Sequence, residues 1–252
     1  MPTLVNSAPS TSITLLAWDT NHFGFSVGRI AAEASDGELQ AALDEARTQG
    51  YRLIYWATSP DRSAPQSLLA QFDGRLVDRK VTFARPLTGV HPAPPSNDLV
   101  IAPVEGTQCP PALIALAVAA GAYSRFAVDP RIPRDKFERL YGIWIERSVR
   151  GEIADAVLVA RDSAEASNDL AGVITVKVTH GVGNIGLVAV SESHRGRGIG
   201  SHLIQAAHRW MIERGANRST VVTQGDNAPA CRLYERAGYS IEQSEHFYHF
   251  WP

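Results

Sequence analysis

The stretch HRGRGIGSHL, residues 194–203, constrains this chain more than any other part of it. It follows the apolar run NIGLVAV (184–190) and precedes apolar residues at helical spacing. A glycine-rich turn between a strand and a helix is an anion site, because the first helical turn has free N–H groups and the helix dipole favours negative charge there. Arg195 and Arg197 add positive charge. The sequence therefore predicts a pyrophosphate cradle.

Two common phosphate-binding loops do not fit this turn. The Walker loop requires a lysine after its last glycine, and no lysine lies near residues 194–203. The dinucleotide fingerprint G-x-G-x-x-G fits Gly196 and Gly198, but Ser201 stands at its third glycine. No suitable acidic residue follows to bind a ribose either.

The pattern R-x-x-G-x-G, formed by Arg195, Gly198 and Gly200, resembles the coenzyme A loop of the GNAT superfamily of N-acetyltransferases. A second pattern, N-x-x-A-x-x-L-Y-x-x-x-G-Y, runs from Asn227 to Tyr239 and is similar to the second signature of that superfamily. The order of predicted strands and helices around the loop matches as well. The resemblance implies an enzyme, an acyltransferase of the GNAT type that uses acetyl-CoA as cosubstrate.

The predicted fold class is α/β (α+β), with a mixed central sheet flanked by helices in the GNAT fold. A smaller α/β domain is predicted to precede it, over residues 1–90. A proline-rich linker is expected at residues 91–98, since this segment has no hydrophobic periodicity. The acetyltransferase domain is then expected to span residues 99–252.

Apolar periodicity and stop signals predict the individual elements. Helices are expected over residues 36–50, 110–123, 134–151, 198–215 and 227–238, with Asn227 as a helix cap. ITLLAWDT (13–20) and FSVGRIAAE (25–33) are expected to be strands around a turn at Asn21–Gly24. YSIEQSEHFYHFW (239–251) is expected to form a pair of strands.

The resemblance also implies roles for single residues. Tyr234 would be the catalytic proton donor to the departing thiolate, a task that suits a phenol because it is neutral at pH 7; the alternative is a packed aromatic residue with its hydroxyl at the surface. Backbone N–H groups of the strand before the loop would polarise the thioester carbonyl. That strand carries no glutamate, so we expect the amine to lose its proton through water or to an unidentified residue. The residues predicted to bind the cosubstrate are Leu187, Val188, Ala189, Val190, Arg195, Gly196, Arg197, Gly198, Ile199, Gly200, Ser201 and Asn227.

Within the superfamily, three stretches resemble the dTDP-4-amino-4,6-dideoxygalactose (dTDP-fucosamine) N-acetyltransferases of polysaccharide biosynthesis. These are LAWDTNHFGFSVGRI (16–30), residues 124–151 and TQGDNAPACRLYERAGY (223–239). The resemblance implies transfer of acetyl to the amino group of a nucleotide-linked amino-deoxy sugar by direct attack in a ternary complex. Arginines suit the diphosphate of such a substrate. The candidates for substrate binding are Arg125, Phe126, Arg131 and Arg134, with solvated arginines and a core phenylalanine as the alternative.

Other functions remain open at this point. The alternatives are an acyltransferase that acts on a different small-molecule or protein amine, and a domain that binds coenzyme A without catalysis. A net charge of −2 gives no reason to expect a nucleic acid polymer as partner, and no apolar run is long enough for membrane insertion. The chain begins without the pattern of a signal peptide, so a cytoplasmic enzyme is expected, and the option of a homodimer is left open. No metal is expected, because the histidines and two cysteines have no ligand spacing.

Overall fold

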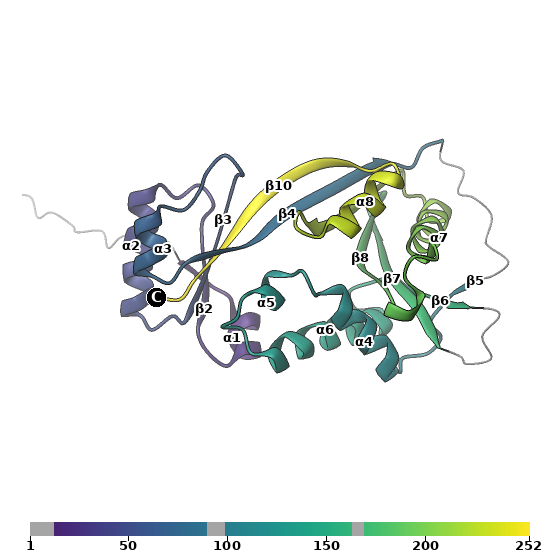
Figure 1. The fold of residues 1–252 in the computed structure, drawn as a ribbon, viewed down its shortest axis with the longest axis horizontal. Coiled ribbons are helices and arrows are strands. Elements are labelled where there is room, and N and C mark those ends of the chain that lie inside the picture. Colours follow the sequence, from purple (N-terminus) through teal and green to yellow (C-terminus); the bar gives the residue numbers. More distant parts are fainter. Residues whose placement is uncertain (1–12, 90–98, 163–168) are drawn as a thin grey trace, which may run out of the picture. The chain divides into compact units, whose positions relative to one another are not determined.

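A computed structural model of the protein describes residues 13–89, 99–162 and 169–252. The chain divides into two compact units (Figure 1), one of Met1–Arg79 with Glu245–Pro252 and one of Lys80–Ser244. This division differs from the predicted domains, since the last residues of the chain belong to the first unit. The predicted linker at residues 91–98 lies outside the described residues, so that boundary stays a prediction.

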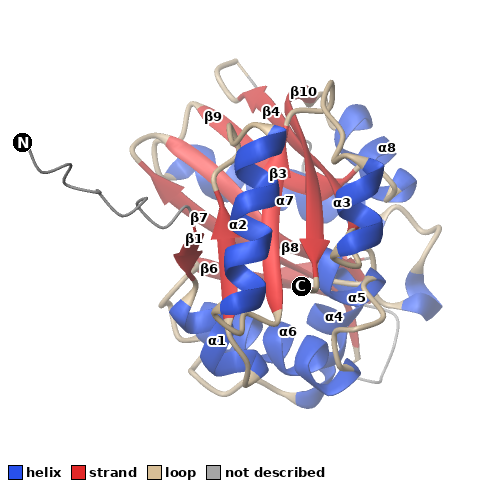
Figure 2. Ribbon diagram, turned by 90° about the vertical axis from the view of Figure 1, so that its left-hand side faces the viewer, coloured by secondary structure: helices blue, strands red, loops and turns tan. Residues whose placement is uncertain are grey.

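The first unit is a small sheet covered by helices. β2 pairs in parallel with β3, and β1 and the end of β10 pair antiparallel on either side of them. Figure 2 shows α2 and α3 in front of these strands, and their leucines pack with Trp56 and Phe250 in one apolar core. The elements are β1 (Ile13–Leu15), α1 (Ala17–Phe23), β2 (Val27–Ile30), α2 (Asp36–Thr48), β3 (Leu53–Thr58), α3 (Gln66–Gln71) and β10 (Ser240–Phe250).

Two predictions for these elements were wrong. Ala17–Phe23 is a helix, not part of a strand, and Gly24 ends it in the left-handed conformation at φ 80° with its N–H donated to the Thr20 carbonyl. The Thr20 hydroxyl then accepts a hydrogen bond from Val27 N at 3.0 Å, which ties the helix to the next strand. Ser240–Phe250 is one long strand, not two. This segment contains no glycine, proline, asparagine or aspartate that favours a turn.

The second unit contains a mixed sheet in the neighbour order β4-β9-β8-β7-β6-β5. Its strands pair antiparallel except for β8 and β9, which are parallel. This arrangement, with helices against the sheet, confirms the predicted fold class. The strands are β4 (Arg75–Pro86), β5 (Leu99–Pro103), β6 (Ala156–Asp162), β7 (Leu170–Thr179), β8 (Val182–Val190) and β9 (Arg218–Gln224).

Helices cover both faces of the sheet in this unit. A Cβ added to Gly183 of β8 would meet Met211 of α7, whereas one added to Gly186 would approach Trp144 of α6. The two helices therefore lie against opposite faces, and α4 packs beside α6. The helices are α4 (Pro111–Ala120), α5 (Arg125–Val128), α6 (Arg134–Val149), the short η1 (Glu192–His194), α7 (Ile199–Glu213) and α8 (Ala228–Arg236).

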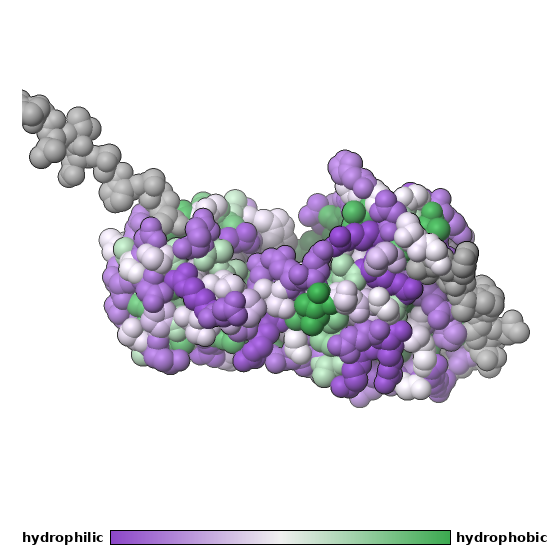
Figure 3. All heavy atoms as spheres, turned by 90° about the horizontal axis from the view of Figure 1, so that it is seen from above, coloured by the Kyte–Doolittle hydropathy of each residue, from purple (hydrophilic) through white to green (hydrophobic). Residues whose placement is uncertain are grey.

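On the face that Figure 3 shows, apolar residues form small patches among polar ones, as expected when most large apolar side chains are buried. None of the helices in the described ranges is both long and apolar enough to cross a bilayer.

Three buried polar side chains connect α7 to the sheet. His208 of α7, Ser219 of β9 and Tyr239 are each 5% exposed or less. The Tyr239 hydroxyl lies 2.8 Å from His208 Nε2 and 2.6 Å from Ser219 Oγ. Burial, together with the nearby Arg85 guanidinium, lowers the pKa of His208 to about 4. The imidazole is therefore neutral at pH 7.

This histidine makes stability depend on pH. Unfolding returns its pKa to about 6.5, so between pH 6.5 and pH 4 the unfolded chain binds the extra proton and the folded state loses stability as the pH falls. From pH 7 to pH 5, we expect the free energy of unfolding to fall by about 2 kcal/mol more in the parent than in His208→Gln. Urea unfolding of both proteins at these pH values measures the difference. Parallel pH dependences would contradict a neutral buried His208.

Candidate active site

The parallel strands β8 and β9 start side by side and then separate. Their pairing runs from Val182 opposite Arg218 to Ile185 opposite Val221 and ends there in the described part of the chain. On its other edge, β8 stays paired with β7 as far as Val190. The second half of β8 therefore has one open edge in the middle of a sheet.

A β-bulge begins where the strands separate. Ile174 pairs with Val188 and Val176 pairs with Ile185, so Thr175 alone stands opposite both Gly186 and Leu187. The buried Thr175 Oγ1 accepts a hydrogen bond from Leu187 N at 2.8 Å. The hydroxyl thus satisfies the backbone group that the bulge removes from the ladder.

The bulge fixes which backbone groups face the open edge. Ser191 N donates to Ala171 O at 2.9 Å, so residues 191 and 189 direct their backbone groups toward β7. Because these directions alternate, Val188 and Val190 direct theirs toward the open edge. The predicted group of Leu187 to Val190 is therefore divided: Val188 N–H is available for a ligand, while Leu187 N–H is bound to Thr175.

A cavity of about 520 Å³ lies at this open edge, and we call it the Tyr234 cavity. Its size is typical of small-molecule sites, which span about 300–1,000 Å³. It brings together six of the residues predicted from the sequence: Val188, Ala189, Val190, Arg195, Asn227 and Tyr234. The sequence analysis missed its wall at the end of α4 and the apolar side of α8, which are Ala119, Ala120, Ala122, Tyr123, Pro229, Ala230 and Leu233.

The glycine-rich loop adjoins one end of this cavity. Gly198 is the N-cap of α7 in the left-handed conformation at φ 78°, which a side chain would disfavour. The N–H groups of Ile199 and Gly200 belong to the first turn and have no acceptor within the helix. Arg195 lines the cavity. Arg197 instead forms an ion pair with Asp162 at 3.2 Å, so the structure does not bring its side chain to the cavity.

Asn227 and Tyr234 enter the cavity from α8. Asn227 Oδ1 accepts a hydrogen bond from Ala230 N at 3.2 Å, which confirms the predicted helix cap. Tyr234 is 4% exposed and packs against the rings of Phe83 and Tyr239. Burial raises the pKa of the Tyr234 phenol well above its usual value, with smaller contributions from Tyr239 and Cys231. The phenol is therefore a neutral proton donor throughout the physiological range.

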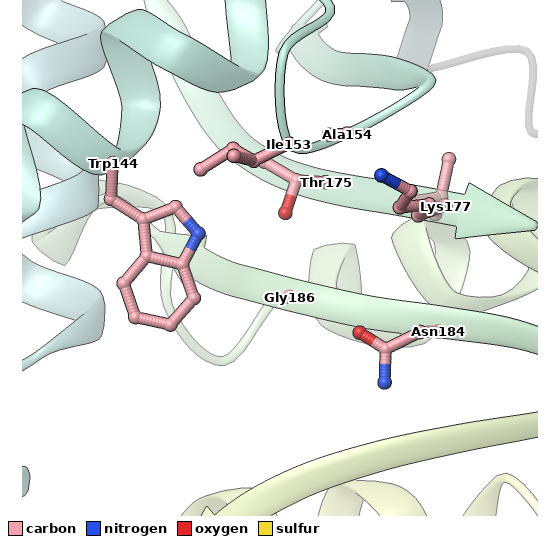
Figure 4. Close-up of a pocket in the computed structure, with 8 residues that line it drawn as sticks. Trp144, Ile153, Ala154, Thr175, Lys177, Asn184 and Gly186 are labelled. Carbon is pink, nitrogen blue, oxygen red and sulfur yellow. The ribbon is translucent and has the colours of Figure 1, made fainter.

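A second cavity, of about 260 Å³, lies on the α6 face of β7 and β8. We call it the Trp144 cavity. Figure 4 shows Trp144 on one side of it and Lys177 and Asn184 on the other, with Thr175 and Gly186 between them. Ile153, Ala154 and Val176 complete the lining. The sequence analysis did not predict Trp144, Lys177 or Asn184 as site residues.

The residues predicted to bind the acceptor are not among those that line either cavity. Arg134 forms an ion pair with Glu138, one helical turn away, at 2.6 Å. Arg125 stacks on the ring of Phe126 at 4.7 Å, and Asp129 accepts a hydrogen bond from Arg131 N at 3.0 Å. Their predicted role in substrate binding stays a prediction. Across the described ranges, no cluster of three or more histidine, cysteine or acidic residues is arranged to hold a metal ion.

Comparison with known proteins identifies the domain. The Acetyltransferase (GNAT) family matches residues 120–239. This segment contains β8, which lines both cavities, together with the glycine-rich loop and α8. Over this segment, 120 of its 252 residues, the chain is similar to GNAT acetyltransferases. The GNAT fold of the chain is also similar to the crystal structure of a GCN5-related N-acetyltransferase from Sphaerobacter thermophilus, with a TM-score of 0.59, 18% identity, and coverage of 94% of this chain and 75% of that one.

Two curated relatives resemble parts of this chain. The spore coat polysaccharide biosynthesis protein SpsD of Bacillus subtilis (strain 168) is 30% identical over 129 residues, which are 51% of this chain and 43% of SpsD. A streptothricin acetyltransferase of Escherichia coli is 34% identical over 107 residues, 42% of this chain and 50% of the relative. The chain thus spans half or less of these relatives.

The GNAT cosubstrate, acetyl-CoA, fits the Tyr234 cavity. The open edge at Val188 and Val190 supplies backbone partners for an extended arm with amide groups, and the first turn of α7 supplies N–H donors for a pyrophosphate. Arg195 adds a cation at the same end of the cavity.

The Thr175 hydroxyl should be necessary for the bulge. We expect Thr175→Val to lower the free energy of unfolding by about 1–3 kcal/mol, because the buried Leu187 N–H loses its acceptor. Thr175→Ser is the matched control, since it keeps the hydroxyl and loses only a methyl group. Denaturant unfolding compares the variants, and a valine variant as stable as the serine variant would refute this role.

Proposed function

We propose that the chain is an N-acetyltransferase that moves acetyl from acetyl-CoA to the amino group of a nucleotide-linked amino-deoxy sugar, a dTDP-4-amino-4,6-dideoxyhexose. The observation that carries the reaction type is the convergence of the Val188 N–H, the first turn of α7 and the Tyr234 phenol on one cavity. The resemblance of three stretches to dTDP-fucosamine acetyltransferases, and the similarity to a polysaccharide biosynthesis protein, support the sugar acceptor.

In this proposal each group of the chain has a separate task. The first turn of α7 and Arg195 hold the pyrophosphate. Val188 N–H donates to the thioester carbonyl oxygen, where negative charge develops as the amine attacks. Tyr234 donates a proton or a hydrogen bond to the sulfur of the leaving thiolate. Acetyl-CoA supplies the activated acyl group.

Direct attack by the amine agrees with the state of the cysteines. Burial raises the pKa of the Cys109 thiol, with Glu146 adding to the effect, and burial and Glu235 do the same for Cys231. Both thiols are therefore protonated at pH 7 and are poor nucleophiles. Neither is among the residues that line the two cavities.

The two cavity linings contain no carboxylate and no histidine. We therefore propose that the amine loses its proton to water that enters the site. Because acetyl-CoA and nucleotide sugars are charged metabolites, we propose a cytoplasmic enzyme. A second candidate acceptor is a small-molecule amine without a nucleotide, which the similarity to a streptothricin acetyltransferase supports.

Removal of the Tyr234 hydroxyl tests the mechanism. We expect Tyr234→Phe to lower kcat by about 10²- to 10⁴-fold, as for loss of a general acid. The KM for acetyl-CoA should stay within about twofold, because uniform binding is unaffected. Thiol release from acetyl-CoA with a dTDP-4-amino-4,6-dideoxyhexose measures both constants.

Tyr51→Phe, in the first unit, is the matched control and should retain parental kinetics. Thermal unfolding checks that both variants are folded. Full kcat in Tyr234→Phe would show that the phenol only packs in the core. The parent protein could instead release thiol with free amines and not with nucleotide sugars. That result would exclude the proposed acceptor and leave the acetyltransferase class intact.

A further inference from the structure

The Trp144 cavity meets β8 at the point where the Tyr234 cavity ends. Asn184 and Gly186 line the first, and Val188 to Val190 line the second. Gly186 and Val188 are two residues apart on one strand, which is about 7 Å. A molecule in the Trp144 cavity therefore lies within reach of a reactive group held at Val188.

Gly186 lines the Trp144 cavity without a side chain. A Cβ at this position would stand 2.7 Å from Thr175 Oγ1 and 3.9 Å from Trp144 Nε1. Any side chain would therefore fill the space between the indole and the strand and would disturb the hydroxyl that holds the bulge. At Gly186 the backbone alone lines the cavity, directly before Leu187 and the open edge of β8.

The lining of the Trp144 cavity carries one formal charge, the Lys177 ammonium group. Lys177 is exposed, and within the described residues no carboxylate is paired with it. It stands directly opposite Asn184 in the β7–β8 pairing. Asn184 Nδ2 donates to Thr220 Oγ1 at 3.2 Å, which orients the amide and leaves its carbonyl oxygen as an acceptor.

We propose that the Trp144 cavity receives the acceptor and that Lys177 selects acceptors that carry a phosphate or diphosphate one sugar ring away from the reacting amine. This inference rests on the proposed function and names a specificity determinant for it. Lys177 pairs with Asn184, which is two residues from Gly186 on β8, about 7 Å along the strand.

The chemistry of a nucleotide-linked 4-amino sugar matches this spacing. Its amino group and its glycosyl phosphate stand at opposite ends of one six-membered ring. An ammonium ion binds phosphate as a point charge, and the Trp144 indole offers a flat apolar face for the ring. A cation that forms no ion pair among the described residues repels a polycationic acceptor, because like charges disfavour each other.

Charge removal at position 177 tests the proposal. We expect Lys177→Gln to raise the KM for a dTDP-4-amino-4,6-dideoxyhexose by about 10- to 100-fold, as for loss of a charged hydrogen bond. The KM for acetyl-CoA and the rate with the same amino sugar lacking the nucleotide should stay unchanged. Lys136→Gln is the matched control, since this α6 lysine lines neither cavity.

A binding measurement separates this inference from the proposed function. Calorimetry measures the affinity for dTDP of protein saturated with coenzyme A. We expect Lys177→Gln to bind dTDP at least tenfold more weakly than the parent. Asn184→Asp should have the same effect, because it places a carboxylate opposite the lysine. Equal effects of the Lys177 and Lys136 substitutions, or no dTDP binding by the parent, would overturn the role of Lys177. A parent protein that binds dTDP through Lys177 but turns over only free amines would overturn the proposed acceptor and leave the role of Lys177 intact.

Discussion

The hydrogen bond between Leu187 N and Thr175 Oγ1 is the interaction on which the rest of the site depends. It lets two residues of β8 stand opposite one residue of β7 without leaving a buried N–H unpaired. The bulge changes the direction of the strand at the place where β9 has already separated from it. As a result, β8 presents Val188 and Val190 to an open edge, and Gly186 to the opposite cavity.

Three helices, α7, α8 and α4, lie around this open edge. α7 begins at Gly198 with its free N–H groups next to one end of the Tyr234 cavity. α8 brings Asn227 and Tyr234 to the same cavity, and the end of α4 closes it with alanines and Tyr123. The buried group of His208, Ser219 and Tyr239 connects α7 with β9 and with the segment that follows α8. The position of Tyr234 is therefore set by packing from α7, α8 and β4 together.

In the proposed reaction each of the two cavities binds a different substrate. The Tyr234 cavity is adjacent to the helix N-terminus and Arg195, and it contains a neutral phenol whose burial keeps it protonated. The Trp144 cavity carries a lysine, an amide and an indole. Because the backbone of β8 passes from one cavity to the other within two residues, the geometry supports direct transfer between two bound molecules.

The glycine-rich turn and the cap of α8 could be predicted from the sequence, because both depend on neighbouring residues. Residues 194–203 specify a glycine turn before a helix, and Asn227 specifies a helix cap seven residues before Tyr234, because φ preferences and helical spacing are properties of neighbouring residues. Only the tertiary structure decided the rest. The bulge arises from the pairing of β7 with β8, so sequence spacing did not show that Leu187 N–H is occupied and Val188 N–H is not.

The same reason explains the residues that were missed and the elements that were wrong. Trp144, Lys177 and Asn184 come from three elements, and their meeting in one cavity depends on how α6 packs on the sheet. The helix at Ala17–Phe23 depends on contacts of Thr20 with Gly24 and Val27, which apolar periodicity does not reveal. Sequence determines what each residue can do, whereas long-range pairing and packing decide which residues act together.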